Sequence, residues 1–211
     1  MKKNNSIYVI GITGGIGTGK STVAGLCREA GLPVLDADKI SHSVTQANGL
    51  AIQEIKDSFG ADYISEDQSL NRKKMSDLVF HDKKALDQLS LIVHHYTLKQ
   101  MSIYLDQLKA SGEKVAVLDV PIPVKEGFLD LCNIVWNVTA NEEIRLVRLQ
   151  NRGMSIEDAK RRIMIQMTPA QYSELADIDI DNSYDFDILR KQVNQLLEDS
   201  LGARGLPYKK I

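Results

Sequence analysis

The feature that most constrains this 211-residue chain is a glycine-rich stretch near its beginning, residues 14–21, which reads GGIGTGKS. It follows a short apolar run, Ile7–Ile12, and precedes residues that can form a helix from Lys20 to a stop at Gly31 and Pro33. Glycines let backbone N–H groups approach phosphate oxygens, and the helix directs its positive end at the same anion. The pattern therefore predicts a phosphate-binding loop, and the lysine and serine argue against a dinucleotide-binding turn.

Within the loop, two side chains carry chemistry. Lys20 is expected to reach the β- and γ-phosphates of a bound nucleotide, and the Ser21 hydroxyl is expected to ligate Mg²⁺. The alternative is a glycine-rich turn between a strand and a helix that binds no ligand.

Acidic residues are predicted to lie beside the loop. Asp36 and Asp38 follow a second short strand, Val34–Leu35, and Asp119 ends an apolar run that begins at Val115. Because the carboxyl ends of parallel strands meet at one sheet edge, we expect these carboxylates near the phosphates. One of the first pair would accept the proton of an attacking hydroxyl, and Asp119 would position Mg²⁺, directly or through water. A helix N-cap is the alternative role for Asp36 or Asp38.

The order of the predicted elements favours an α/β fold with a parallel sheet and a helical insert. From Asp38 to about Ala110 the pattern is helical, with Leu86, Leu89, Val93 and Tyr96 expected on a buried face. We expect residues 46–111 to form an inserted helical subdomain that covers the ligand edge of the sheet, and residues 1–45 and 112–211 to form a nucleotide-binding core.

The second half of the chain is expected to complete the sheet. Strands are predicted at Val115–Val120, Ile134–Val138 and Ile178–Ile180, and helices after the capping patterns Thr139 to Glu142 and Ser155 to Asp158. A closing helix is expected at Phe186–Leu201, followed by a loose tail, Gly202–Ile211.

Three arginines lie three and four residues apart, at Arg145, Arg148 and Arg152, and therefore share a helix face. Arginines on a helical hairpin can cover a triphosphate and stabilise its charge during phosphoryl transfer. A solvated basic face is the competing interpretation.

Composition excludes some functions. The 26 basic and 28 acidic residues give a formal net charge of −2, which argues against a duplex-DNA binder held by a basic surface. No apolar run approaches the ~20 residues that cross a bilayer. Cys27 and Cys132 lie far apart and outside metal-ligand spacing, so we expect reduced thiols and a cytoplasmic protein.

Taken together, these motifs resemble the dephospho-CoA kinase family nearly end to end. The resemblance rests on the extended loop and the Asp-Ala-Asp that follows it, and on further matches at Leu70-Asn71-Arg72, Val93-His94, Leu118-Asp119-Val120-Pro121, Gln166, Ala176-Asp177, Ile180 and Asn182. The resemblance implies a P-loop nucleoside-triphosphate hydrolase/kinase fold with a helical substrate-binding insert and a small lid, about residues 145–175.

The family's reaction is transfer of the ATP γ-phosphate to the ribose 3′-hydroxyl of dephospho-CoA, the final step of coenzyme A biosynthesis. The resemblance implies ATP and Mg²⁺ as cofactors and dephospho-CoA as the small-molecule partner, in a monomer or weak homo-oligomer that binds neither nucleic acid nor membrane. Catalysis would fall to Asp38 as general base, with Lys20 and Arg148. The other implied positions are Gly15, Ile16, Gly17, Thr18, Gly19, Lys20, Ser21, Thr22, Arg148 and Arg152 for ATP, Asp36, Asp38, Arg72, His94 and Pro121 for the acceptor, and Ser21 and Asp119 for the metal.

The sequence departs from the family pattern in two places. Lys125 stands where the family has a glutamate, and residues 168–175 contain no basic side chain. The alternatives are therefore another small-molecule P-loop kinase acting on a nucleoside or nucleoside monophosphate, or a catalytically weakened paralogue. A GTPase switch is disfavoured because no Asn-Lys-x-Asp motif occurs.

Overall fold

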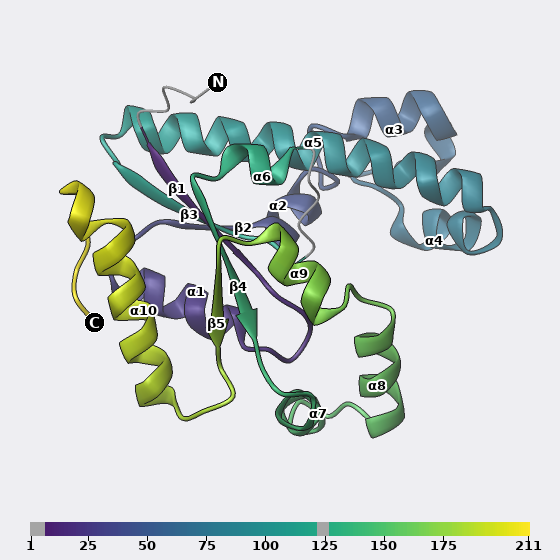
Figure 1. The fold of residues 1–211 in the computed structure, drawn as a ribbon. Coiled ribbons are helices and arrows are strands. Elements are labelled where there is room, and N and C mark those ends of the chain that lie inside the picture. Colours follow the sequence, from purple (N-terminus) through teal and green to yellow (C-terminus); the bar gives the residue numbers. More distant parts are fainter. Residues whose placement is uncertain (1–6, 122–126) are drawn as a thin grey trace. The chain divides into compact units, whose positions relative to one another are not determined.

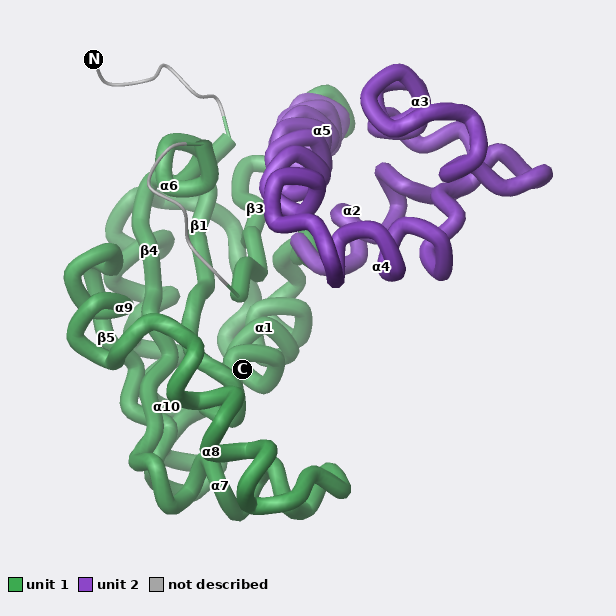
Figure 2. Tube along the Cα trace, turned by 90° about the vertical axis from the view of Figure 1, so that its right-hand side faces the viewer, with its two compact units in different colours: residues 1–36, 108–211 green, residues 37–107 purple. Residues whose placement is uncertain are grey.

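The computed structural model describes residues 7–121 and 127–211, and it divides into two compact units. One unit contains the residues up to Asp36 together with Leu108–Ile211, and the other is Ala37–Gln107 (Figure 2). Lys125, which stands where the family has a glutamate, lies outside the described residues. Each unit is described below by itself.

The first unit is built on a five-stranded sheet in which all neighbours run parallel (Figure 1). The strand order is β2-β3-β1-β4-β5, so the strand that leads into the glycine-rich loop lies at the centre. The predicted α/β class and parallel sheet are confirmed. The strands are β1 Tyr8–Thr13, β2 Val34–Asp36, β3 Val115–Asp119, β4 Ile134–Thr139 and β5 Ile178–Asp181.

Two helices, α1 (Lys20–Glu29) and α10 (Phe186–Ser200), pack against one face of this sheet. Alternation along β1 explains the packing: Ile10 and Ile12 join the core shared with these helices, whereas Gly11 faces the other side. There α6 (Phe128–Leu131) lies so close that a Cβ at Gly11 would approach the Phe128 ring to 3.2 Å. Another short helix, α9 (Pro169–Leu175), packs on β4.

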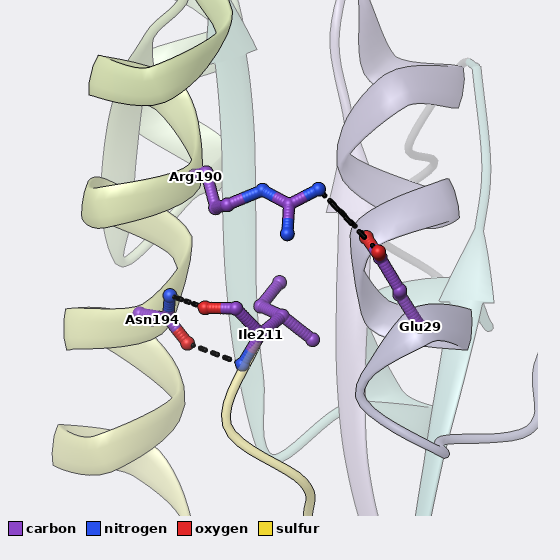
Figure 3. Close-up of polar contacts among 4 residues, drawn as sticks. All are labelled: Glu29, Arg190, Asn194 and Ile211. Atoms are coloured by element: carbon purple, nitrogen blue, oxygen red, sulfur yellow. Dashed lines mark hydrogen bonds and ion pairs between the residues drawn. The ribbon is translucent and has the colours of Figure 1, made fainter.

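The end of the chain is fixed to this core, so the expectation of a loose tail was wrong. Asn194 of α10 donates to the Ile211 carbonyl and accepts a 2.9 Å hydrogen bond from its N–H (Figure 3). Beside it, Arg190 of α10 lies 3.2 Å from the Glu29 carboxylate at the end of α1. Apolar side chains explain the attachment, because Ile211 packs, partly buried, against the cluster between the two helices.

The helical unit contains α2 Ala37–Ser43, α3 Ile52–Phe59, the 3₁₀ turn η1 Ala61–Tyr63, α4 Arg72–His81 and most of α5 Lys83–Ala110. Its core gathers Val44, Ala51, Ile55, Leu70, Met75 and Ile92. The unit begins at Ala37, earlier than the expected boundary at 46, because Val44 belongs to this core.

The expected apolar stripe on α5 is correct only in part. Leu89, Val93 and Tyr96 pack against the core of the helical unit, but Leu86 is 43% exposed, whereas Ile92 is buried in that core. A spacing of three and four residues predicts that side chains share a face, but several neighbouring stripes satisfy it on a helix this long.

The helices of the second half differ from expectation at one boundary. Thr139 is the last residue of β4 and donates to the Ile180 carbonyl, so it does not cap α7 (Glu142–Gln150). Ser155 does cap α8 (Ile156–Met164), accepting from the Asp158 N–H at 3.1 Å. Because Thr139 is part of the sheet, the first capping pattern does not begin a helix. Only the second pattern, at Ser155, does.

Across the described residues, no helix combines the length and apolar character needed to span a bilayer. Both cysteines are free, and burial raises the pKa of each thiol, Cys27 and Cys132, to about 12.

Candidate active site

The glycine-rich loop connects β1, at the centre of the sheet, to the first turn of α1. Gly14, Gly17 and Gly19 have φ values of 149°, 79° and 93°, which residues with a Cβ rarely adopt. A Cβ at Gly14 would also lie 2.5 Å from the Val138 carbonyl. The loop therefore needs glycine both for its conformation and for close packing, and its backbone N–H groups are presented at the N-terminus of a helix.

Lys20, the first residue of α1, forms an ion pair with Asp119 at the end of β3. The two side chains are 18% and 7% exposed, so the pair is largely removed from solvent. Asp36 is the register partner of Asp119 across β2 and β3. The register thus places Asp36 and Asp119 at neighbouring strand ends, whereas Asp38, predicted to lie with them, belongs to the helical unit.

The Thr18 carbonyl in the loop accepts hydrogen bonds from two residues late in the chain. Asn182 Nδ2 donates to it at 2.7 Å, and Arg148 Nη1 donates at 3.1 Å. Arg148 Nη2 also donates to the Asn182 carbonyl at 2.9 Å, so the three groups form one network. Burial, and then the charge of Arg152, lower the pKa of the Arg148 guanidinium. Asn182 belongs to one of the sequence motifs named above, but the sequence alone does not predict its role.

Both backbone groups of Ile16 are bonded to side chains. Its N–H donates to Gln166 Oε1 at 2.7 Å, and its carbonyl accepts from Arg145 Nε at 2.8 Å. Arg145 is 7% exposed, and burial lowers the pKa of its guanidinium. Of the three arginines predicted to share a helix face, Arg145 and Arg148 lie on α7 and Arg152 lies beyond its end. The sequence did not predict that the first two donate to the loop backbone.

A cavity of about 340 Å³ borders the helix end of the loop. Arg152, which lies beyond the end of α7 and is exposed, contributes to its wall together with Arg148. The remaining lining residues are Gly19, Thr22, Asn151, Asn182, Tyr184, Phe186 and Leu189. Aromatic faces, amides and guanidinium groups are the chemistry that binds a purine base.

The remaining predicted site residues are divided between the two units. Pro121 follows β3, and its carbonyl accepts from the buried Tyr172 hydroxyl of α9 at 3.1 Å. Asp38, in the first turn of α2, is exposed. Arg72 begins α4 and donates to Thr45 Oγ1 at 2.9 Å, and His94 lies half-buried on α5. The last three belong to the helical unit.

A parallel sheet whose central strand runs into a glycine-rich loop, with a lysine at the following helix and acids at the adjacent strand ends, defines a P-loop kinase fold. Comparison with known proteins narrows the class. The chain matches the sequence profile of the dephospho-CoA kinases over residues 8–187. It is 37% identical over 194 residues to the dephospho-CoA kinase of Dehalococcoides mccartyi, covering 92% of this chain and 98% of the relative. The chain belongs to the dephospho-CoA kinase family.

Further relatives agree with this assignment. The dephospho-CoA kinase of Carboxydothermus hydrogenoformans is 35% identical over 191 residues, covering 90% of this chain and 93% of the relative. Among solved structures, TT1252 from Thermus thermophilus superposes with a TM-score of 0.73 at 29% identity, covering 92% of this chain and 97% of that one. The Campylobacter jejuni dephospho-CoA kinase, with a TM-score of 0.68 at 24% identity, covers 92% and 98% and supports the fold.

Proposed function

We propose that this chain is an ATP-dependent phosphotransferase that moves the γ-phosphate of ATP to the ribose 3′-hydroxyl of dephospho-CoA, completing coenzyme A biosynthesis. The observation that carries the proposal is the family match over residues 8–187, which includes the loop, the Lys20–Asp119 pair and the bracing arginines. The loop supplies the phosphate site, and the family supplies the acceptor.

On the ATP side, the backbone N–H groups of the loop and the N-terminus of α1 would hold the phosphates, in the stretch from Gly15 to Thr22. Lys20 would exchange its contact with Asp119 for the β- and γ-phosphates as charge develops on them. The base would lie in the 340 Å³ cavity that begins at Gly19, with Arg148 and Arg152 along its wall.

The oxygen ligands fit Mg²⁺, which prefers a hydroxyl or one or two carboxylates and completes its shell with water and phosphate oxygens. Ser21 in the first turn of α1 and Asp119 at the strand end offer this set. Within the described residues no cluster of three or more His, Cys, Asp or Glu could hold a metal alone, which agrees with a metal that arrives with its nucleotide. When bound, Mg²⁺ would neutralise developing phosphate charge.

On the acceptor side, Asp38 would accept the proton of the attacking ribose hydroxyl, which needs an accessible carboxylate. Its exposure in the first turn of α2 supports this role. Asp36, Pro121, Arg72 and His94 would contact the same substrate. Arg148 and Arg152, together with the hairpin at residues 145–175, would serve as the lid. The two free cysteines support a cytoplasmic location.

The test is a coupled ADP-release assay with ATP and Mg²⁺ on four acceptors: dephospho-CoA, adenosine, AMP and pantetheine. We expect turnover with dephospho-CoA alone. Preference for adenosine or AMP would contradict the proposed acceptor and favour a nucleoside or nucleoside monophosphate kinase. No turnover with any acceptor would favour a catalytically weakened paralogue.

The same assay tests the loop. Lys20→Ala should lower turnover by at least the order of 10²-fold, because it removes a preorganised cation from the developing charge. The matched control is Lys191→Ala, which changes an exposed lysine on α10 of the same unit and should leave turnover unchanged. Equal turnover in the two folded variants would contradict the role of Lys20.

A further inference from the structure

The connection between α8 and α9 touches the phosphate loop at one peptide group. Gln166 follows α8 and accepts the Ile16 N–H at 2.7 Å through Oε1, across 150 residues of chain. From the other side Arg145 Nε donates to the Ile16 carbonyl at 2.8 Å. The peptide that carries the Ile16 N–H also carries the Gly15 carbonyl, which accepts from Thr18 Oγ1 at 2.9 Å, so both ends of the Gly15–Ile16 peptide are bonded to side chains.

The packing around this contact leaves no space for a side chain at Gly15. A Cβ there would lie 2.8 Å from Arg145 Nη2 and 3.2 Å from Gln166 Oε1. On the other flank, a Cβ at Gly17 would lie 3.0 Å from the Arg145 carbonyl. The start of the loop is therefore fitted between the α7 arginine and the glutamine.

The chemistry of the contact is unusual for such a loop. Loop N–H groups are expected to donate to phosphate oxygens, whereas the Ile16 N–H donates to a neutral amide oxygen. Gln166 thus uses one donor of the loop and holds the Gly15–Ile16 peptide, whereas Arg145 holds the next peptide, the one that carries the Gly17 N–H. The backbone of Gln166 remains part of the hairpin, because the Gln166 N–H donates to the Ile163 carbonyl.

We propose that Gln166 is a positioning residue for phosphoryl transfer. It orients the Gly15–Ile16 peptide at the start of the phosphate loop, next to the peptide that Arg145 holds, and it ties the α8–α9 connection to that orientation. Arg145 is its partner on the carbonyl side. The expected effect of Gln166 on the kinetics rests on the proposed function, whereas the contact between Gln166 and the loop does not.

The test compares Gln166→Leu, which removes the acceptor at similar size, with Gln166→Glu, which keeps an oxygen acceptor. The matched control is Asn194→Leu in α10, because Asn194 Oδ1 also accepts a backbone N–H, that of Ile211 at 2.9 Å, outside the loop and the hairpin. The first readout is hydrogen exchange of the Ile16 amide by NMR. The second is the separate measurement of kcat and of KM for ATP.

We expect Gln166→Leu to lose Ile16 amide protection and to lower kcat/KM for ATP about tenfold, the equivalent of one buried hydrogen bond. Gln166→Glu should restore the amide protection, and Asn194→Leu should match the parent chain in both readouts. Unchanged Ile16 protection, or equal kinetic losses in Gln166→Leu and Asn194→Leu, would overturn the proposal. If the parent chain phosphorylates no acceptor, the proposed function fails, and amide exchange with ATP titration still decides the role of Gln166. If Gln166→Leu does not fold, Gln166→Asn, which shortens the same amide, takes its place.

Discussion

Replacing Asn182 with alanine should weaken nucleotide binding, because it removes a hydrogen bond that holds the Thr18 carbonyl of the loop. Asn182 is 4% exposed, and its amide donates to the Thr18 carbonyl at 2.7 Å. Removing a buried hydrogen bond costs about 1–3 kcal/mol when the partner is left unpaired. Here the carbonyl keeps the Arg148 Nη1 donor at 3.1 Å, so the lower part of that range applies, about 1–2 kcal/mol.

Asn194→Ala is the matched control. It removes an asparagine from the same unit that also bonds backbone groups, the N–H and carbonyl of Ile211, far from the loop in sequence (Figure 3). Both variants should lower the melting temperature by about 2–8 °C, which corresponds to about 1–2 kcal/mol in a chain of this size. Only Asn182→Ala should lower ATP affinity, by about tenfold, because only its carbonyl partner belongs to the loop.

Thermal unfolding followed by circular dichroism gives the stability loss, and isothermal titration with ATP gives the affinity. The reasoning is refuted if the Asn182 variant binds ATP as the parent chain does. It is refuted equally if both variants lose affinity in proportion to their stability, since the effect would then be global.

Two further predictions concern the acceptor side and the thiols. Asp38→Asn should lower turnover by about 10²–10⁴-fold while ATP affinity is kept, as measured by the coupled assay and titration; a collapse of ATP affinity instead would mean that Asp38 acts through Mg²⁺ and would make Asp36 the candidate base. Cys27 and Cys132 should resist iodoacetamide in the native chain at about pH 8 and react after unfolding in urea, because burial raises both pKa values to about 12 and the thiolate is the nucleophile. The pKa values of both thiols in the folded chain lie above the usual value of 9.0. Their contribution to the free energy of unfolding is therefore complete below pH 9.0 and is lost as the pH rises toward 12. Denaturant titration at increasing pH will measure this loss. Rapid labelling of the native chain would show that the thiols are accessible.

The parts of the fold that the sequence predicted correctly depend on neighbouring residues. The glycine-rich loop needs a strand before it and a helix after it, and all three lie within the first 29 residues. The acid at the end of β3 follows from a short apolar run, and the cap at Ser155 from a pattern of four residues. Such signals are local, so they can be interpreted without knowing the rest of the structure.

The parts that sequence reasoning missed depend on distant partners. Gln166 and Asn182 are separated from the loop residues they bond by 150 and 164 positions, and nothing in their own surroundings indicates a loop contact. The tail was expected to be loose because Gly202–Ile211 lacks periodicity, although its attachment depends on Asn194 and on the cluster between α1 and α10. Thr139 matched a capping pattern, but pairing with β5 determined its place.

These missed contacts change how the glycine-rich motif is understood. The glycines permit the loop conformation, but permissive residues do not select one conformation, since glycine also has the largest freedom to leave it. Selection comes from the second half of the chain: one pair of side chains binds the N–H and the carbonyl of Ile16, and another pair binds the carbonyl of Thr18. Each pair includes an arginine of α7, and each arginine donates to a backbone carbonyl, so the carbonyls are drawn toward the protein. The N–H groups that follow along the loop are thereby left for an anion. A chain with a net charge of −2 can in this way build a site for a triphosphate, because the loop and the cations that brace it concentrate positive potential at one edge of the sheet.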